Sequence, residues 1–281
     1  MRKLFSSSEL FFKYLVGALM IVLVVSLFFE FDLEMKPGKN SEKVYELMER
    51  VPSGSKILIV VNYGPEAKYE LEDALSSIVG YFAAKEVGVV FVTLTPVGVE
   101  SAFMAVEKSL KNSDFIKRRY LYGNDYVHLG YIAGNSVGAF LLSANFSKAK
   151  KLDIYGGELD TFSVMNGITQ LDDFAAVFEV SSRLVDGIPG ITLFSVFSKD
   201  KELPKIAICS SDMVPNYLPF YKSDSFQGFV GGFKDVAGLV KTIDPSSNIW
   251  KKYGTTSIVL CFILFVIIVA GVKRAVRGEE K

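Results

Sequence analysis

The chain reads KILIVVNYGP from Lys56 to Pro65, an apolar and largely β-branched run that ends in a polar pair and a Gly-Pro turn. Such a run is typical of a strand that is buried on both faces of a parallel sheet. The sequence after the turn predicts a helix, whose buried face consists of Leu71, Ala74, Leu75, Ile78 and Phe82. The stretch therefore predicts one strand-helix unit of an α/β protein.

The same alternation continues along the chain. Residues 87–94 repeat the strand pattern, and Ala102, Phe103, Val106 and Leu110 mark the next helix. Further strands are expected at 126–132, 174–180 and 206–209, with helices at 40–51, 139–148, 190–197 and 230–242. Five strands in this alternation predict a doubly wound, mostly parallel sheet, either Rossmann-like or flavodoxin-like.

Two strongly apolar segments flank this region, at residues 10–30 and 253–272. A helix of about 20 apolar residues matches the roughly 30 Å hydrocarbon core of a bilayer. The first segment also resembles a secretory signal peptide, but no small-residue cleavage pattern follows Phe29, so we expect it to stay as an anchor. The sequence thus predicts that two transmembrane helices flank the α/β domain.

Basic residues outside the two segments predict the orientation. Arg2 and Lys3 precede the first segment, while Lys273 and Arg274 follow the second, which favours two cytoplasmic termini and an extracytoplasmic central domain in the cell membrane. The expected order is a cytoplasmic tail (1–9), transmembrane helix 1 (10–30), a linker helix (31–54), the α/β domain (55–243), a linker (244–252), transmembrane helix 2 (253–272) and a second cytoplasmic tail (273–281).

Composition excludes several classes of function. The formal net charge is zero and no cluster of Lys and Arg with interleaved aromatic residues occurs, so nucleic acid is not an expected partner. No dinucleotide or P-loop fingerprint follows the first strand, and we expect no cofactor. The single histidine, His128, alternates with apolar neighbours and has no cysteine close by, so no metal site is expected.

The sequence Gly134-Asn135-Ser136-Val137-Gly138 satisfies the G-x-S-x-G pattern between an expected strand and an expected helix. A nucleophile elbow occupies that position in α/β hydrolases, which makes Ser136 a weak catalytic candidate. His128 precedes Ser136, whereas the hydrolase order places the histidine last, so only a Ser/Lys arrangement is open. The alternative is a glycine-rich turn in which Ser136 or Asn135 caps the helix.

In open α/β sheets, ligands bind outside the carboxyl ends of the strands. The expected ends carry neutral hydrogen-bonding groups and little charge, which suits a small polar ligand better than a phosphate. The candidate ligand-binding residues are Asn62, Tyr63, Thr95, Tyr131, Ser181, Ser182, Ser210, Ser211 and Asp212. Polar strand ends are also common in such folds without any ligand.

Two loop features have a structural and a functional interpretation. Asp172 and Asp173 precede an expected strand and form either a divalent-ion site or, as we favour, a solvated loop. Gly228, Gly231 and Gly232 precede the last helix of the domain and either meet an anion or allow close helix packing, which we favour.

Two segments resemble a prokaryotic family of membrane-anchored α/β proteins: Tyr122 to Tyr126 followed by Leu129-Gly130-Tyr131, and Ser225 to Lys234. The resemblance covers roughly residues 55–243, and the chain departs from it after Lys234, where Asp235-Val236 replaces small residues. The resemblance implies the fold and the anchoring, but no activity and no site residues.

The tails are too short for a signalling or catalytic domain, so we expect a non-enzymatic scaffold or binding subunit of a membrane complex. Its partners would be the lipid bilayer and either another membrane protein or a second copy of the chain. The alternatives are an extracytoplasmic domain that binds a small polar ligand and a serine hydrolase that uses Ser136.

Overall fold

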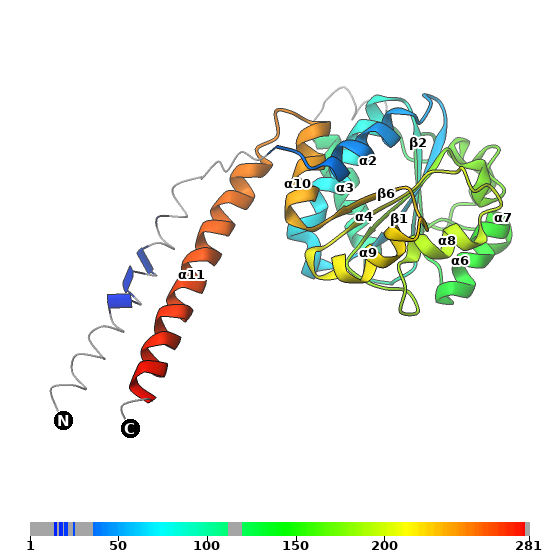
Figure 1. Ribbon diagram of the computed structural model, residues 1–281. Helices are drawn as coiled ribbons and strands as arrows, with labels where there is room; N and C mark the ends of the chain where they lie inside the picture. The colour runs from blue at the N-terminus through cyan, green and yellow to red at the C-terminus, as the bar shows by residue number, and fades with distance from the viewer. Residues whose placement is uncertain are drawn as a thin grey trace. The chain divides into compact units, whose positions relative to one another are not determined.

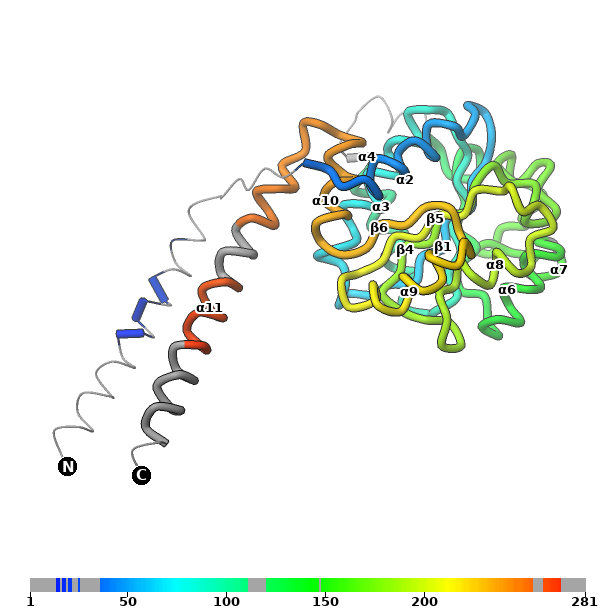
Figure 2. Tube along the Cα trace, in the orientation of Figure 1, coloured from blue at the N-terminus to red at the C-terminus, as the bar shows by residue number. Residues whose placement is uncertain are grey.

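The computed structural model describes residues 36–111 and 120–278 together with Tyr14, Leu15, Gly17, Ala18, Met20, Ile21 and Val25, without the side chains of 111, 147, 255–259 and 269–278 (Figure 2). The chain divides into two compact units. Residues 36–246 form the α/β domain, and residues 1–35 and 247–281 form the second unit.

The domain is built on a parallel sheet of six strands in the order β3-β2-β1-β4-β5-β6 (Figure 1). This is the Rossmann order, in which β1 and β4 are neighbours, and not the flavodoxin-like order. The doubly wound α/β fold is therefore confirmed. The strands are β1 (Lys56–Asn62), β2 (Gly88–Thr93), β3 (Tyr126–Tyr131), β4 (Ala176–Ser181), β5 (Lys205–Cys209) and β6 (Gly228–Gly231).

Helices cover both faces of the sheet (Figure 1). One face carries α2 (Lys39–Glu49), α3 (Lys68–Ala84), α4 (Gly98–Lys111) and α10 (Gly232–Ile243), where α3 packs against both α4 and α10. The opposite face carries α6 (Asn135–Ala144), α7 (Phe146–Ala149), α8 (Gly190–Phe197) and α9 (Val214–Lys222). Both faces of the strands are thus covered, which explains why their sequences are continuously apolar.

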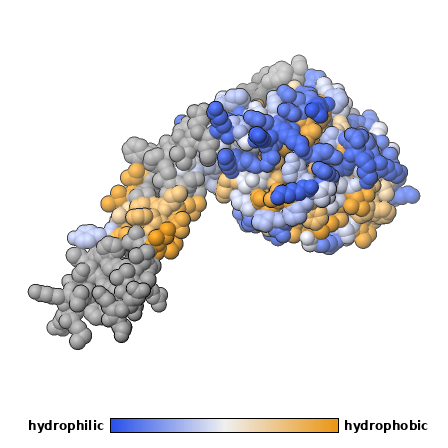
Figure 3. Space-filling view, viewed as in Figure 1, coloured by the Kyte–Doolittle hydropathy of each residue, from blue (hydrophilic) through white to orange (hydrophobic). Residues whose placement is uncertain are grey.

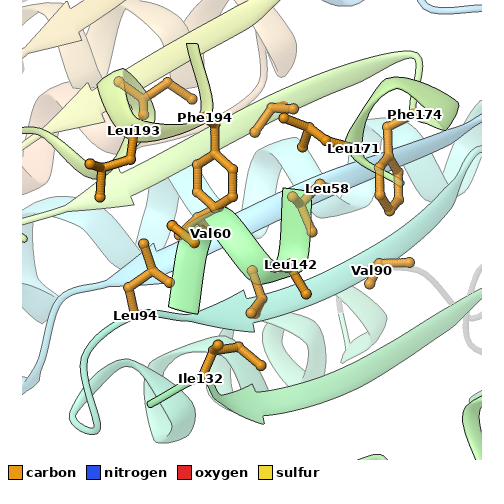
Figure 4. Packing of buried hydrophobic residues seen from close by; sticks show 14 of the residues in the cluster. Leu58, Val60, Val90, Leu94, Ile132, Leu142, Leu171, Phe174, Leu193 and Phe194 are labelled. Carbon is orange, nitrogen blue, oxygen red and sulfur yellow. The ribbon is translucent and has the colours of Figure 1, made fainter. Parts of the chain in front are cut away.

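The core on the α6 and α8 side shows how the helices dock (Figure 4). Leu58 and Val60 of β1 lie beneath Leu142 of α6 and Phe194 of α8, and all four side chains are fully buried. Burying a side chain of this size is worth about 1.5–3 kcal/mol. This packing holds the beginnings of α6 and α8 at the carboxyl edge of the sheet.

Several elements differ from the sequence predictions. The helix expected at 139–148 is divided into α6, which already begins at Asn135, and α7. Residues 228–231 form β6, a sixth strand, and the helix expected at 230–242 begins only at Gly232, whose positive φ of 81° suits glycine. The helix α9 was not predicted because Pro219 lies inside it. Pro215 lies in its first turn, where the missing N–H is tolerated.

The helix α2, which the sequence analysis placed in a linker, belongs to the domain. It packs against α10 and β6. The Ser41 hydroxyl donates to the backbone oxygen of Asp235 at 2.8 Å, and the Asn40 amide donates to the Asp235 carboxylate at 3.2 Å. The compact unit accordingly begins at Lys36 rather than at residue 55.

The second unit contains α11 (Ile249–Gly278), a single helix of 30 residues that includes the apolar segment 253–272. Its side chains Leu260, Leu264, Phe265 and Ile267 are each more than half exposed. Most of segment 10–30, and all of 1–9 and 279–281, lie outside the described residues. Among the described residues, no helix has both the length and the apolar character needed to cross a membrane.

Candidate functional site

The strand order creates one crevice position, between β1 and β4. After β1 the chain turns through a short 3₁₀ helix (Pro65–Ala67) into α3 on one face, whereas after β4 it leads to α8 on the other. Asn62 and Ser181 are paired in register at the ends of these two strands. In this fold, ligands bind where neighbouring connections diverge in this way.

The polar groups that the sequence placed at this point bond to the protein itself. The Asn62 side chain accepts from the Leu94 backbone N–H at 2.9 Å and donates to Glu179 Oε1 at 2.9 Å. The Ser181 hydroxyl donates to the backbone oxygen of Arg183 at 2.7 Å. Both Asn62 and Ser181 are fully buried. They therefore tie strand ends and loops together rather than face solvent.

An ion pair joins the loops that follow β1 and β4. Arg183, after β4, donates to Glu66 Oε1 at 2.8 Å, and the Ser182 hydroxyl donates to the same oxygen at 3.2 Å. Both charged side chains are close to half exposed. Glu66 and Arg183, which lie outside the predicted set of candidate residues, thus add charge at this edge of the sheet.

A buried carboxyl group lies beside Asn62. Glu179 on β4 is fully buried, and its Oε2 accepts from the backbone N–H of Ile191 in the first turn of α8 at 2.8 Å. A side chain at Gly190 would collide with Glu179 Oε1, so glycine is needed there. Burial raises the pKa of Glu179 to about 7, against the hydrogen bonds from Ile191 and Asn62, which favour the ionised form.

Two further buried groups surround Glu179. Burial, together with the neighbouring Glu179, raises the pKa of the Cys209 thiol on β5 and of the Tyr217 hydroxyl on α9. Because a thiol with a raised pKa stays protonated, Cys209 is not prepared to act as a nucleophile. The cluster is a polar part of the core that attaches α8 to the sheet.

The residues after β5 form a second small group. The Ser211 hydroxyl donates to Glu70 Oε1 of α3 at 2.7 Å and accepts from the Phe233 N–H at the start of α10 at 3.2 Å. The buried Ser210 donates to the exposed Asp212. Burial raises the pKa of Glu70. These contacts connect the β5 loop with α3 and α10.

The remaining candidates lie on the other side of β1. The side chain of Tyr63 is fully buried, and its backbone oxygen accepts from Ser101 of α4 at 2.9 Å. Thr95 is half-buried in the turn before α4, and Tyr131 ends the edge strand β3. The nine candidates therefore follow the edge of the sheet but do not surround a single open crevice.

The G-x-S-x-G turn has an acid as its neighbour. The Asp186 carboxylate, from the loop after β4, accepts from the Ser136 backbone N–H at 3.1 Å and from the Asn135 side chain at 2.8 Å. Hydrogen bonds from Ser136 and Asn135 lower the pKa of Asp186. Asn135 has a positive φ of 50°, as does Gly134 at 96°. Asp186, rather than a side chain of the turn, therefore caps α6.

His128 does not serve as a base for Ser136. Its ring is stacked on the Phe91 ring, with centroids 4.5 Å apart. The Phe103 ring is tilted against the imidazole, and the centroids of these two rings are 4.2 Å apart. The side chain is 1% exposed, and burial lowers its pKa to about 3. A neutral histidine sealed between two aromatic rings is a core residue, so His128 does not assist Ser136.

The two loop features have structural roles. Asp172 accepts from the Ser198 hydroxyl at 2.6 Å, and Asp173 accepts from the Thr169 and Gln170 N–H groups, so both acids hold turns. At Gly228, any side chain would press against Val44, Leu47 and Ile206. Among the described residues, no group of three or more His, Cys, Asp or Glu side chains is placed to hold a metal ion.

Two cavities lie in the crossover between β3 and β4. One of about 480 Å³ is lined by Lys150, Lys151, Leu152, Glu158, Leu159 and Asp160. The second, of about 210 Å³, shares Leu159 and Asp160 and includes Asn166, whose backbone oxygen accepts from Lys56 at the amino end of β1. The second cavity therefore adjoins the amino edge of the sheet, opposite the crevice position.

Sequence reasoning missed Glu66, Glu179, Arg183 and Asp186. A signal existed for Glu179, because an acidic residue inside the apolar run 174–180 must be buried with partners. The contacts of Glu66, Arg183 and Asp186 depend on which loops meet, and no pattern in the sequence shows that.

Comparisons of the chain with models of protein families, with curated proteins and with solved structures gave no match.

Proposed function

We propose that this protein is a non-enzymatic binding subunit of a membrane complex, anchored by segments 10–30 and 253–272, and that it contacts its partner through α6 and α8. Membrane anchoring, an extracytoplasmic domain and kinship with prokaryotic membrane-anchored α/β proteins are supported by the apolar segments, the flanking charges and the sequence resemblance described above.

The observation that carries the proposal is an exposed apolar surface, the α6–α8 face, formed by Val137, Phe140, Leu141, Val196 and Phe197. Val137 is 62% exposed and Val196 65% exposed. The rings of Phe140 and Phe197 meet edge to face at 5.2 Å, so the two helices form one continuous surface. Hydrophobic side chains gather over α6 and α8 at the lower right of the domain in Figure 3. Contiguous apolar surface of this kind is typical of a docking site.

The state of the candidate site argues in the same direction. His128 is sealed in the core, and the buried Asn62 and Ser181 bond to the protein itself. These polar groups hold strands and loops together, whereas the α6–α8 face is exposed.

Binding of a small polar ligand at the crevice is the second candidate, and the Glu66–Arg183 pair favours it. Exposed ion pairs contribute only about 0–1 kcal/mol, so a ligand with charged or polar groups has little to displace. This second candidate function predicts that such a ligand raises the melting temperature of the protein and that Arg183→Ala abolishes the increase.

The test of the leading proposal is co-purification of the full-length tagged protein from native membranes in mild detergent, comparing the wild type with Val196→Asp. We expect at least one protein, another chain or a second copy of this one, at fixed stoichiometry in the wild type and its loss in the variant, because a buried unpaired carboxylate opposes docking. Tyr155→Asp is the matched control, since Tyr155 is 70% exposed on another surface. Equal recovery of partners with Val196→Asp would refute the role of this face.

A further inference from the structure

The connection between α7 and β4 is longer than the fold requires. Residues 150–175 contain only three 3₁₀ turns of three residues each. Loops of more than about 12–15 residues without regular structure are uncommon in compact domains and are often functional. Both cavities described above are lined mainly by this segment. The segment therefore surrounds space that a ligand can occupy.

The larger cavity, which we call the charged cavity, is lined by charges of both signs. It contains two lysines, two acids and two leucines: Lys150, Lys151, Glu158, Asp160, Leu152 and Leu159. An antiparallel bridge pairs Leu152 with Glu158, and this register places Lys150 opposite Asp160. Within the part of the chain that the structure describes, the four charged side chains form no ion pair and no hydrogen bond. They are therefore available to a ligand.

The smaller cavity adjoins the charged cavity, since both are lined by Leu159 and Asp160. We call it the apolar cavity, because four buried apolar side chains form most of its wall: Phe146, Leu159, Met165 and Ile168, with Asn166 and Gly167 completing the lining. Its volume is about 210 Å³, whereas an apolar cavity of about 150 Å³ accommodates benzene. The apolar cavity thus has room for one aromatic or branched aliphatic side chain.

Hydrogen bonds hold the walls of both cavities in place without a ligand. The Phe146 N–H donates to the Thr169 backbone oxygen at 2.9 Å, which joins the two ends of the apolar cavity. The buried Asp153 carboxylate accepts from the Gly157 N–H and from the Tyr122 hydroxyl, both at 2.6 Å, so this acid fixes the turn between the lysines and the acids of the charged cavity. A site that is already formed loses little conformational entropy on binding.

We propose that the two cavities together bind a zwitterionic ligand with one apolar side chain, as in a short peptide or a free amino acid. Lys150 and Lys151 bind its carboxylate, Glu158 and Asp160 bind its ammonium group, and the apolar cavity takes its side chain. The charged cavity measures about 480 Å³, within the range of about 300–1,000 Å³ that is typical of small-ligand sites. Two carboxylates in the same cavity oppose a simple anion such as phosphate. This binding role goes beyond docking through the α6–α8 face and does not depend on it.

Isothermal titration calorimetry of the full chain in mild detergent tests the proposal. The first probe is the tripeptide glycyl-phenylalanyl-glycine with both ends free, which we expect to bind. Its N-acetylated and C-amidated forms should each bind about tenfold more weakly, because each loses one charged group that the cavity binds. Triglycine, which lacks the apolar side chain, should also bind at least about tenfold more weakly.

Substitutions assign each end of the peptide to its residues. Lys150→Ala combined with Lys151→Ala should weaken binding of the unblocked tripeptide about tenfold but hardly change that of the C-amidated form, which has no carboxylate to lose. Glu158→Gln combined with Asp160→Asn should act likewise on the unblocked and N-acetylated forms. Lys222→Ala, exposed at the end of α9, is the matched control and should change neither. Melting temperatures without ligand should stay near the wild-type value, because the four cavity side chains have no partner in the described chain.

Free phenylalanine distinguishes the two sources of the ligand. Binding as tight as that of the tripeptide supports the site and identifies a free amino acid, whereas weaker binding identifies a short peptide. Absence of heat and of any rise in melting temperature with every probe at millimolar concentration overturns the proposal, as does binding that both cavity variants leave unchanged. Val196→Asp should bind the tripeptide as the wild type does, so failure of the docking role and failure of this site are observed separately.

Discussion

Glu179→Gln should remove a large part of the pH dependence of folding. Glu179 is fully buried beneath α8, and burial raises its pKa from 4.5 to about 7. A group whose pKa is raised in the folded protein favours folding fully below its unfolded pKa, and that contribution is lost as the pH rises through the folded pKa. The stability that Glu179 contributes to the wild type should therefore be lost as the pH rises from about 4 to about 8.

The magnitude follows from the size of the shift. Each pKa unit corresponds to about 1.36 kcal/mol, so the shift of the Glu179 pKa amounts to roughly 3 kcal/mol across this interval. The Gln variant keeps the shape of the side chain but cannot ionise. Glu179 accepts hydrogen bonds from the Asn62 amide and the Ile191 N–H, and the NH₂ group of glutamine would face one of these donors. The variant protein should therefore be about 1 kcal/mol less stable than the wild type at low pH.

The assay is urea denaturation of the full chain in detergent at several pH values, read as the difference between wild type and Glu179→Gln. Taking the difference cancels the contributions of other titrating groups. The difference should shift in favour of the variant by about 3 kcal/mol on going from acid to mildly alkaline pH. A difference that stays constant would show that Glu179 has an ordinary pKa and that the hydrogen bonds from Asn62 and Ile191 outweigh its burial.

Three further predictions concern other parts of the chain. His128→Phe should abolish a second, opposite pH dependence. The pKa of buried His128 is lowered from 6.5 to about 3, so it favours folding above pH 6.5 and the wild type loses about 2 kcal/mol on acidification to about pH 5, as urea midpoints would show. Ser136→Ala should leave the folded protein and its partners unchanged, and an activated phosphonate should not label Ser136. Stoichiometric labelling that the substitution removes would revive the hydrolase interpretation. The chain should stay in the membrane pellet after alkaline carbonate extraction, while added protease should cut the domain only from the extracytoplasmic side. Release into the supernatant would contradict anchoring.

The sequence by itself determined the fold class and most of the elements. Buried parallel strands are continuously apolar, so residues 56–62 and 126–131 were recognisable without neighbours. It did not show β6, which is only four residues long with a glycine at each end, or α9, which contains an internal proline. Short elements of this kind are held by packing rather than by local preference.

The tertiary structure alone decided what the candidate site residues do. Ser136 and His128 are only eight residues apart in the sequence. In the structure, however, His128 of β3 lies in the core between Phe91 and Phe103, whereas Ser136 lies beside Asp186. In the same way, the ion pair of Glu66 with Arg183 joins loops far apart in the chain. Periodicity reports which side of an element is buried, whereas loop contacts depend on strand order, and strand order is fixed only when the sheet assembles.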